Sequence, residues 1–252
     1  MIGVVTLFRK EIRRFLKVPG QTVFAPVGTT ILYLLVFGYA LGGRLREVGG
    51  LPYFDFIVPG LVTLGITSNA FMNTSSSVMG MKLMGTIVDL LVTPLTPLQV
   101  VGAMVGASAA RGLLVGALTW ATAVGFRGEI HVAHPLLAIA FPLLTAIGFA
   151  ALGLVTGLWA EGFERLNFVP AFVLTPLTFL GGVFYDVRML PPTLAALSHA
   201  NPILYLVEGM RFGLYGSAGV EPAVGLLALA SFDVLVVGAC LAALASGWKI
   251  RN

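Results

Sequence analysis

The sequence is poor in charged residues and contains a single cysteine. Asp, Glu, Lys and Arg make up only 10% of the chain, whereas a soluble globular domain has about 25%. Hydrophobic residues make up 58%. With Cys240 alone, the chain can form no internal disulfide framework and no cysteine-based metal site. The composition therefore excludes an ordinary soluble domain and favours a membrane protein.

Motifs for catalysis and nucleotide binding are also missing. A Walker loop requires Gly-x-x-x-x-Gly-Lys-Ser/Thr, and no lysine of this chain follows a glycine. There is no Gly-x-Ser-x-Gly motif and no paired intramembrane aspartate, which argues against a membrane protease. The net charge of +4 is explained by membrane topology rather than by nucleic-acid binding. We therefore expect no enzyme activity, no cofactor or metal in this chain, and no nucleic-acid partner.

Long apolar segments fill most of the chain, each matching the ~20 residues that a helix needs to cross a bilayer core. They are residues 18–43, 56–81, 90–126, 135–160, 166–185 and 222–247. Arg111 and Asp233 are the only charged residues within them. Backbone polar groups find no partner in lipid, so such segments cross as helices. The predicted fold is all-α: one transmembrane domain, residues 1–252, with six crossings.

The positions of Lys and Arg predict the orientation, because cations collect on the cytoplasmic side. Cations precede the first crossing and follow the last, which places both termini in the cytoplasm. The cations assigned inside are Arg9, Lys10, Arg13, Arg14, Lys17, Lys82, Arg165, Lys249 and Arg251, and those assigned outside are Arg44, Arg46, Arg127, Arg188 and Arg211. A cleaved signal peptide is the competing interpretation, but the first apolar run exceeds the roughly 7–15 residues of a signal core.

Residues 1–17 have the pattern of an amphipathic helix in the headgroup region. The apolar stripe consists of Val4, Val5, Phe8, Ile12, Phe15 and Leu16, and the cations occupy the remaining positions. Two interpretations stay open. The helix is either an anchor that satisfies the positive-inside rule or a docking surface for a cytoplasmic partner.

A second short helix is predicted over residues 79–93, stopped by Pro94 and Pro97. It is too apolar to stand free in water and too short to be another crossing. We expect it to press against the membrane or another protein.

The region 186–216 contains irregular, proline-rich sequence outside the predicted crossings. Pro191 and Pro192 precede a helix that Asn201 caps and Pro202 begins. Glu208 and Arg211 can pair along that helix, and Gly216 ends it. About 14 residues span ~21 Å, which is less than the ~30 Å bilayer core. We expect a re-entrant or outer-surface element.

Polar residues inside the crossings are expensive and need partners. Arg111 and Asp233 fall at similar depth, so they form an ion pair, or Arg111 faces an aqueous cavity, or each charge is accommodated separately. Asn69, Asn73 and Ser76 share a face of the second crossing. They either form interhelical hydrogen bonds or line a pathway.

Glycines four residues apart recur in the crossings and indicate close packing of helices within one subunit. The pairs are Gly38/Gly42, Gly102/Gly106, Gly112/Gly116 and Gly153/Gly157.

Several segments, in order along the chain, resemble the permease subunits of ABC-2 type transporters. They are Phe56–Leu61, Leu90–Pro94, Ala110–Gly116, Phe168–Tyr185, Leu190–Pro192, Leu197–Tyr205 and Gly209–Gly213. The block from 168 to 213 is the specific part. The chain is most similar to the short bacterial inner-membrane permeases related to nodulation-factor and drug exporters.

This resemblance implies the membrane-spanning half of an ATP-driven exporter of the bacterial inner membrane, moving a lipid, a lipid-linked glycan or a hydrophobic drug. It implies a dimer of permeases, two separate ATP-binding subunits that carry ATP and Mg²⁺, and a pathway bounded mainly by crossings one, two and five. It also implies that the 79–93 helix couples to the ATPase. The residues expected to contact the ATPase are Arg9, Lys10, Arg13, Arg14, Lys82, Asp89 and Thr93.

The alternative is a gradient-driven transporter. That class places several ionisable residues in the membrane and has two related halves, and neither feature is found in this sequence.

Overall fold

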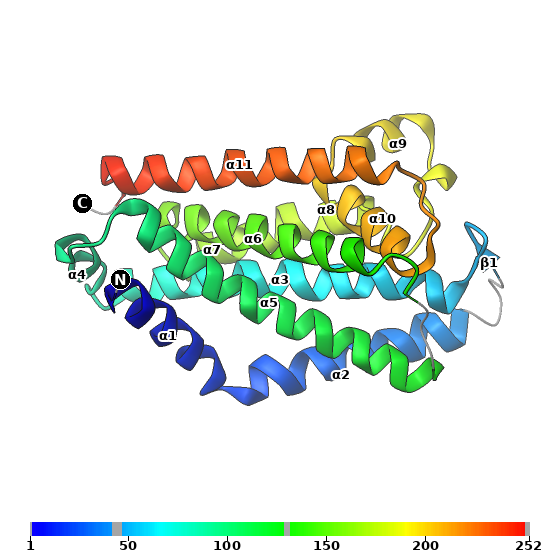
Figure 1. The fold of residues 1–252 in the computed structure, drawn as a ribbon, viewed down its shortest axis with the longest axis horizontal. Coiled ribbons are helices and arrows are strands. Elements are labelled where there is room, and N and C mark those ends of the chain that lie inside the picture. Colours follow the sequence, from blue (N-terminus) through cyan, green and yellow to red (C-terminus); the bar gives the residue numbers. More distant parts are fainter. Residues whose placement is uncertain (1, 42–46, 129–131, 250–252) are drawn as a thin grey trace.

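The computed structural model describes residues 2–41, 47–128 and 132–249, except for the side chains of 39–41, 90 and 91. Arg44, Arg46, Arg251 and Gly42 lie outside the described residues. The described chain is almost entirely helical (Figure 1). The five helices that are long and apolar enough to cross a membrane are Gly20–Gly38, Tyr53–Leu83, Pro97–Arg127, Pro135–Trp159 and Pro222–Ser246.

The first of these crossings is a helix with two π-helical turns. Its parts are η1 (Gly20–Phe24), α2 (Ala25–Tyr33) and η2 (Leu34–Leu41). The other four are α3 (Tyr53–Leu83), α5 (Pro97–Arg127), α6 (Pro135–Trp159) and α11 (Pro222–Ser246). In Figure 1 α11, α6, α3, α5 and α2 follow one another from top to bottom, and each contacts the next.

The sixth predicted crossing, 166–185, lies within a broken helical run. Its parts are α7 (Phe163–Val169), η3 (Pro170–Leu174) and α8 (Thr175–Leu180), followed by turns. Pro170 has no N–H to donate, and the π-helical turn begins at this residue. The count of six crossings therefore stays a prediction.

The two ends of the bundle differ. Both termini and α4 (Ile87–Val92) lie at one end, which we name the terminal end (Figure 1). Lys249 Nζ lies 2.7 Å from Glu161 Oε1 there, and Lys82 Nζ donates to the carbonyl oxygens of Leu158 and Ala160 at 2.8 and 2.6 Å.

The opposite end, which we name the capped end, holds three short elements after the α8 turns. These are η4 (Val187–Met189), α9 (Pro192–His199) and α10 (Pro202–Tyr215). A two-stranded hairpin of β1 (Glu47–Val48) and β2 (Leu51–Pro52) lies there too (Figure 1). Its turn uses Gly49 and Gly50 at φ values of 60° and 80°, which glycine adopts without steric cost.

Glycine brings α3 close to both of its neighbours. A Cβ on Gly112 of α5 would lie 2.9 Å from Ala70 Cβ and 3.0 Å from Ile66 O. A Cβ on Gly157 of α6 would lie 2.8 Å from Val78 Cβ. The predicted close packing is confirmed at these positions. It does not hold at Gly102, where a Cβ would meet nothing within 4 Å.

The helix predicted after Asn201 is confirmed in its details. The Asn201 side chain accepts from Ile203 N at 3.0 Å, Pro202 is the first helical residue, and Gly216 ends α10 at φ 69°. The α10 helix packs among α3, α6 and α11. Asn201 also donates to Leu177 O at 2.6 Å, which joins α10 to α8.

The boundaries predicted for the short helix 79–93 are wrong at its start. The α3 helix continues to Leu83, and α4 covers only Ile87–Val92. Gly85 interrupts the helical course at φ 70°. The error arose because the apolar pattern runs through this glycine, whose left-handed conformation ends α3.

The N-terminal helix α1 (Ile2–Leu16) packs on the bundle through a face that shares only Phe15 with the predicted apolar stripe. Its buried residues are Leu7, Glu11 and Phe15, and it packs on α5. Val5 and Leu16 of the predicted apolar stripe are exposed instead. The helix therefore has one face packed against the bundle and a second, apolar face that is free to contact lipid.

The glycine contacts of α3 predict a clear difference between two identical substitutions. Gly157→Ala should lower the free energy of unfolding by about 1–3 kcal/mol, because its new methyl group overlaps Val78 and the Ser75 carbonyl. Gly102→Ala should cost nothing, since its methyl group meets open space. Thermal unfolding of the purified chain in detergent measures both. Equal stability of the two variants would contradict the packing described.

Candidate functional site

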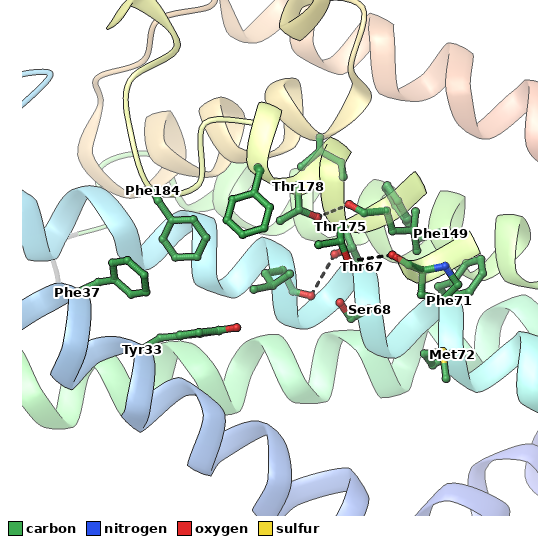
Figure 2. Close-up of a pocket in the computed structure, with 15 residues that line it drawn as sticks. Tyr33, Phe37, Thr67, Ser68, Phe71, Met72, Phe149, Thr175, Thr178 and Phe184 are labelled. Carbon is green, nitrogen blue, oxygen red and sulfur yellow. Dashed lines mark hydrogen bonds between the residues drawn. The ribbon is translucent and has the colours of Figure 1, made fainter. Parts of the chain in front are cut away.

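A cavity of about 230 Å³ lies between the first crossing, α3 and the 170–184 segment (Figure 2). The α3 helix contributes Thr67, Ser68, Phe71 and Met72, and Phe149 of α6 closes one side. The remaining lining residues named in the figure are Tyr33, Phe37, Thr175, Thr178 and Phe184. The lining is therefore mainly aromatic and aliphatic with a few hydroxyls, which suits an amphipathic or apolar ligand.

Aromatic rings close this cavity toward the capped end. Phe37 and Phe184 have ring centroids 4.7 Å apart, and each lies 6.0 Å from Tyr33. Phe179 lies 5.9 Å from Phe184. The Tyr53 hydroxyl donates to Phe184 O at 3.1 Å and holds that segment in place. The rings come from two segments far apart in the sequence, the first crossing and residues 179–184.

A second hollow, a groove of about 310 Å³, runs between α2, α3 and α5. It shares Tyr33, Leu64 and Ser68 with the cavity, so the two adjoin along α3. Asn69 lines the groove and donates to Gly65 O of its own helix at 3.0 Å. Across the groove the hydroxyls of Thr30 and Thr119 lie 3.2 Å apart.

A polar cluster joins α1, α3 and α5 near the terminal end. Asn73 is its centre: its Oδ1 accepts from Arg14 Nη2 at 2.9 Å and from Arg111 Nη1 at 3.2 Å, and its Nδ2 donates to Ser108 Oγ at 2.8 Å. Arg14 also donates to the Asn73 carbonyl at 2.6 Å. Asn73 thus forms the interhelical hydrogen bonds that its sequence position favoured. Within the described part of the chain, the Ser76 hydroxyl bonds to its own helix, donating to Asn73 O.

Glu11 belongs to the same cluster and was missed by sequence reasoning. Its carboxylate lies 3.0 Å from Arg14 Nε and 3.1 Å from Lys10 Nζ, and it accepts from Ser77 Oγ at 2.8 Å. Burial opposes its ionisation, but Arg14, the Ser77 hydroxyl and Lys10 outweigh burial and hold the pKa of Glu11 below its usual value. The sequence did contain a signal for this position: Glu11 lies four residues from both Leu7 and Phe15, so the three residues share one face of the helix.

The predicted Glu208–Arg211 pair is present and fully buried at the capped end. Arg211 contacts Glu208 directly and donates to Phe56 O at 3.3 Å and Gly182 O at 3.2 Å. Its guanidinium also lies over the Phe56 ring, 3.8 Å from the centroid. Glu208 in turn accepts from Gly219 N. These contacts fasten α10 to α3 and to the turn after α8.

Of the three arrangements that the sequence left open for Arg111 and Asp233, the ion pair is absent and each charge has its own surroundings. Arg111 turns to Asn73 instead, and Asp233 of α11 lies against Gly148 of α6. Neither carboxylate oxygen of Asp233 has a hydrogen-bond partner among the described residues. The ion-pair alternative rested on similar depth in two crossings, which says nothing about which helices are neighbours.

The residues expected to contact an ATPase lie in different settings. Arg9 and Arg13 are exposed, as is Asp89 in the first turn of α4, and Thr93 follows the last residue of α4. Lys10 is bound to Glu11, and Arg14 is bound to both Glu11 and Asn73. Lys82 is tied to the carbonyl groups at the end of α6. Pro191 and Pro192 begin α9.

The apolar crossings define the chain as a multi-pass helical membrane protein. The family model described as ABC-2 type transporter matches residues 3–215, so the chain belongs to this family. Members are transport permeases of ABC transporters and work with an ATP-binding subunit. The chain is a multi-pass protein of the bacterial inner membrane.

Individual relatives agree with this assignment. The chain is 40% identical to the inner membrane transport permease YadH of Escherichia coli K12, over 94% of this chain and 90% of YadH. It is 27% identical to Nodulation protein J of Sinorhizobium fredii, over 92% and 88% of the two chains. It is 24% identical to Nodulation protein J of Rhizobium meliloti, again over 92% and 88%.

Two double-mutant cycles distinguish the buried charges. For Arg111→Leu and Asp233→Leu we expect losses of stability that add to within about 0.5 kcal/mol, because the two side chains do not touch. For Glu208→Leu and Arg211→Leu we expect a coupling of about 0.5–3 kcal/mol, because each variant leaves the other charge buried. Thermal unfolding in detergent gives both values. Strong coupling in the first cycle would contradict the separate positions of Arg111 and Asp233.

Proposed function

We propose that the chain is the membrane-spanning subunit of an ATP-driven exporter that moves a lipid, a lipid-linked glycan or a hydrophobic drug across the inner membrane. The cavity is the observation that supports this proposal. Its lining comes from the first crossing, from α3 and from the 170–184 segment, the three elements that the family resemblance implied. Its aromatic walls with scattered hydroxyls suit amphipathic cargo.

In this proposal the terminal end faces the cytoplasm and the capped end faces outward. The 163–180 run serves as the remaining crossing, and α9 and α10 form a re-entrant cap over the pathway. A second copy of the permease completes the pathway. Phe168 and Phe172 offer a surface for such a contact, since both are exposed and stack with ring centroids 4.7 Å apart.

Energy would come from two ATP-binding subunits docked at the terminal end, which hold the ATP and Mg²⁺. The α4 helix is the contact that couples them. Met84, Val88 and Val92 are exposed on or beside this helix, and a short helix with uncovered apolar side chains requires a partner surface. Asp89 on the same helix, together with Arg9 and Arg13 on α1, would add charged contacts.

A gradient-driven transporter receives no support from the structure. Asp233, the one acidic residue in the predicted crossings, lies between α6 and α11 rather than in the cavity or the groove. No described carboxylate lines either hollow. We therefore retain the ATP-driven mechanism alone.

Matched aspartate substitutions at the two ends test the coupling role of α4. Val92 is 78% exposed at the terminal end, and Met189 is 64% exposed at the capped end. We expect Val92→Asp to reduce co-purification of the ATP-binding subunit at least tenfold, because it places a charge on the apolar contact. Met189→Asp should leave assembly unchanged. Normal assembly and normal ATP-dependent transport in Val92→Asp would show that α4 is not part of the interface.

Cysteine labelling tests the orientation in intact cells. In a Cys240→Ala background, Ser217→Cys at the capped end should react with a membrane-impermeant maleimide. Arg165→Cys at the terminal end should react only after the membrane is permeabilised. Labelling of position 165 in intact cells would show that the proposed orientation or the number of crossings is wrong.

A further inference from the structure

Arg111 has an unbalanced positive charge inside the bundle. Its one described hydrogen bond goes to the neutral amide oxygen of Asn73, which Arg14 already shares. Its Nε is buried without a hydrogen-bond partner, and no described carboxylate pairs with it. The nearest acid of the cluster, Glu11, is committed to Lys10 and Arg14.

Such an arrangement is costly unless an anion completes it. A guanidinium within a crossing needs a counter-charge, and two guanidinium groups converging on one amide oxygen repel each other. The buried Arg211 differs in its charge balance: a carboxylate, two carbonyl groups and an aromatic face surround it, although its Nε also has no hydrogen-bond partner among the described residues. Arg111 has no comparable set of partners.

The groove between α2, α3 and α5 ends one helical turn short of this charge, and Arg111 is not among its lining residues. Asn69 lines the groove on α3, one helical turn before Asn73. Val115 lines it on α5, one helical turn after Arg111. A ligand with its polar head at Arg111 therefore has room for a chain along Ala25, Leu61 and Leu64, past the hydroxyls of the groove. Arg14 is two residues from the end of α1, where the chain turns into the first crossing, so the head lies near the membrane boundary.

We propose that Arg111, with Arg14, binds the phosphate of a lipid headgroup, and that the lipid's chain occupies the groove between α2, α3 and α5. Phosphate fits because a guanidinium donates two parallel N–H bonds to it, and Arg111 has no carboxylate partner among the described residues. A lipid fits because the groove adjoins the cavity through Tyr33, Leu64 and Ser68. This site adds the charge of the ligand to the proposed function. Its role in transport rests on that proposed function.

Lipid titration of the purified full-length permease in detergent tests the site directly. Dioctanoyl phosphatidylglycerol should raise the midpoint of thermal unfolding in the wild type. In Arg111→Gln the half-maximal concentration should increase at least tenfold, and Arg111→Lys should lie between the two because it keeps the charge but loses the paired donors. The matched control is Arg165→Gln, an exposed arginine at the same end, which should titrate as the wild type.

The outcomes separate the possible ligands. Identical titrations of Arg111→Gln and the wild type would overturn the site, and if that variant does not fold, an unchanged titration of Arg111→Lys would do so. Equal stabilisation by inorganic phosphate would overturn the lipid assignment, and equal stabilisation by dioctanoyl phosphatidylcholine would overturn the requirement for an anionic head.

ATP hydrolysis in the complex with the ATP-binding subunit distinguishes a transported lipid from a resident one. Stimulation by the anionic lipid that Arg111→Gln abolishes supports binding of cargo. A normal titration without stimulation supports the site and assigns it a resident bilayer lipid. If the complex hydrolyses no ATP, the proposed function fails, while the titration of the permease alone still decides the site.

Discussion

Close packing of α3 between α5 and α6 is the contact on which the other elements depend. Inside a bilayer, apolar side chains gain little by moving from lipid to protein, so helices associate through tight van der Waals contact. Gly112 and Gly116 of α5 and Gly153 and Gly157 of α6 allow this contact on two sides of α3. With α3 fixed, its polar face presents Asn69 and Asn73 to the groove and to α1, and its other end supports α10.

The buried charges then fall into two kinds. At the capped end, Glu208 and Arg211 satisfy each other and link α10 to α3, which makes the cap a rigid part of the fold. Toward the terminal end, Arg14 and Arg111 meet at Asn73, and Glu11 is the only acid bonded to this group among the described residues. This second group connects the N-terminal helix to the wall of the groove. In the proposed orientation α1 lies beside the docked ATPase together with α4, so a change in α1 would reach the groove through Arg14 and Asn73.

Local patterns were predicted well wherever the cause is local. Asn201, Pro202 and Gly216 mark the ends of α10 because capping depends on residues a few positions apart. The Glu208–Arg211 pair could be predicted because the two residues lie three positions apart, about one helical turn. The start of α4 was predicted wrongly because Gly85 leaves the helical conformation without interrupting the apolar pattern. The inward face of α1 was missed because a charged residue, Glu11, lies on it, paired with a hydroxyl 66 residues away in sequence.

The sequence by itself determined the membrane class, most of the crossings, the helix caps and the family resemblance, because each depends on composition, short spacing or linear motifs. Only the tertiary structure decided which helices are neighbours. It separated Arg111 from Asp233, brought Arg14 to Asn73, and placed the cavity between the first crossing, α3 and the 170–184 segment. The reason is physical: in lipid every face of an apolar helix looks similar, and the contacts between helices are chosen by shape and by the pairing of a few polar groups that lie far apart in sequence.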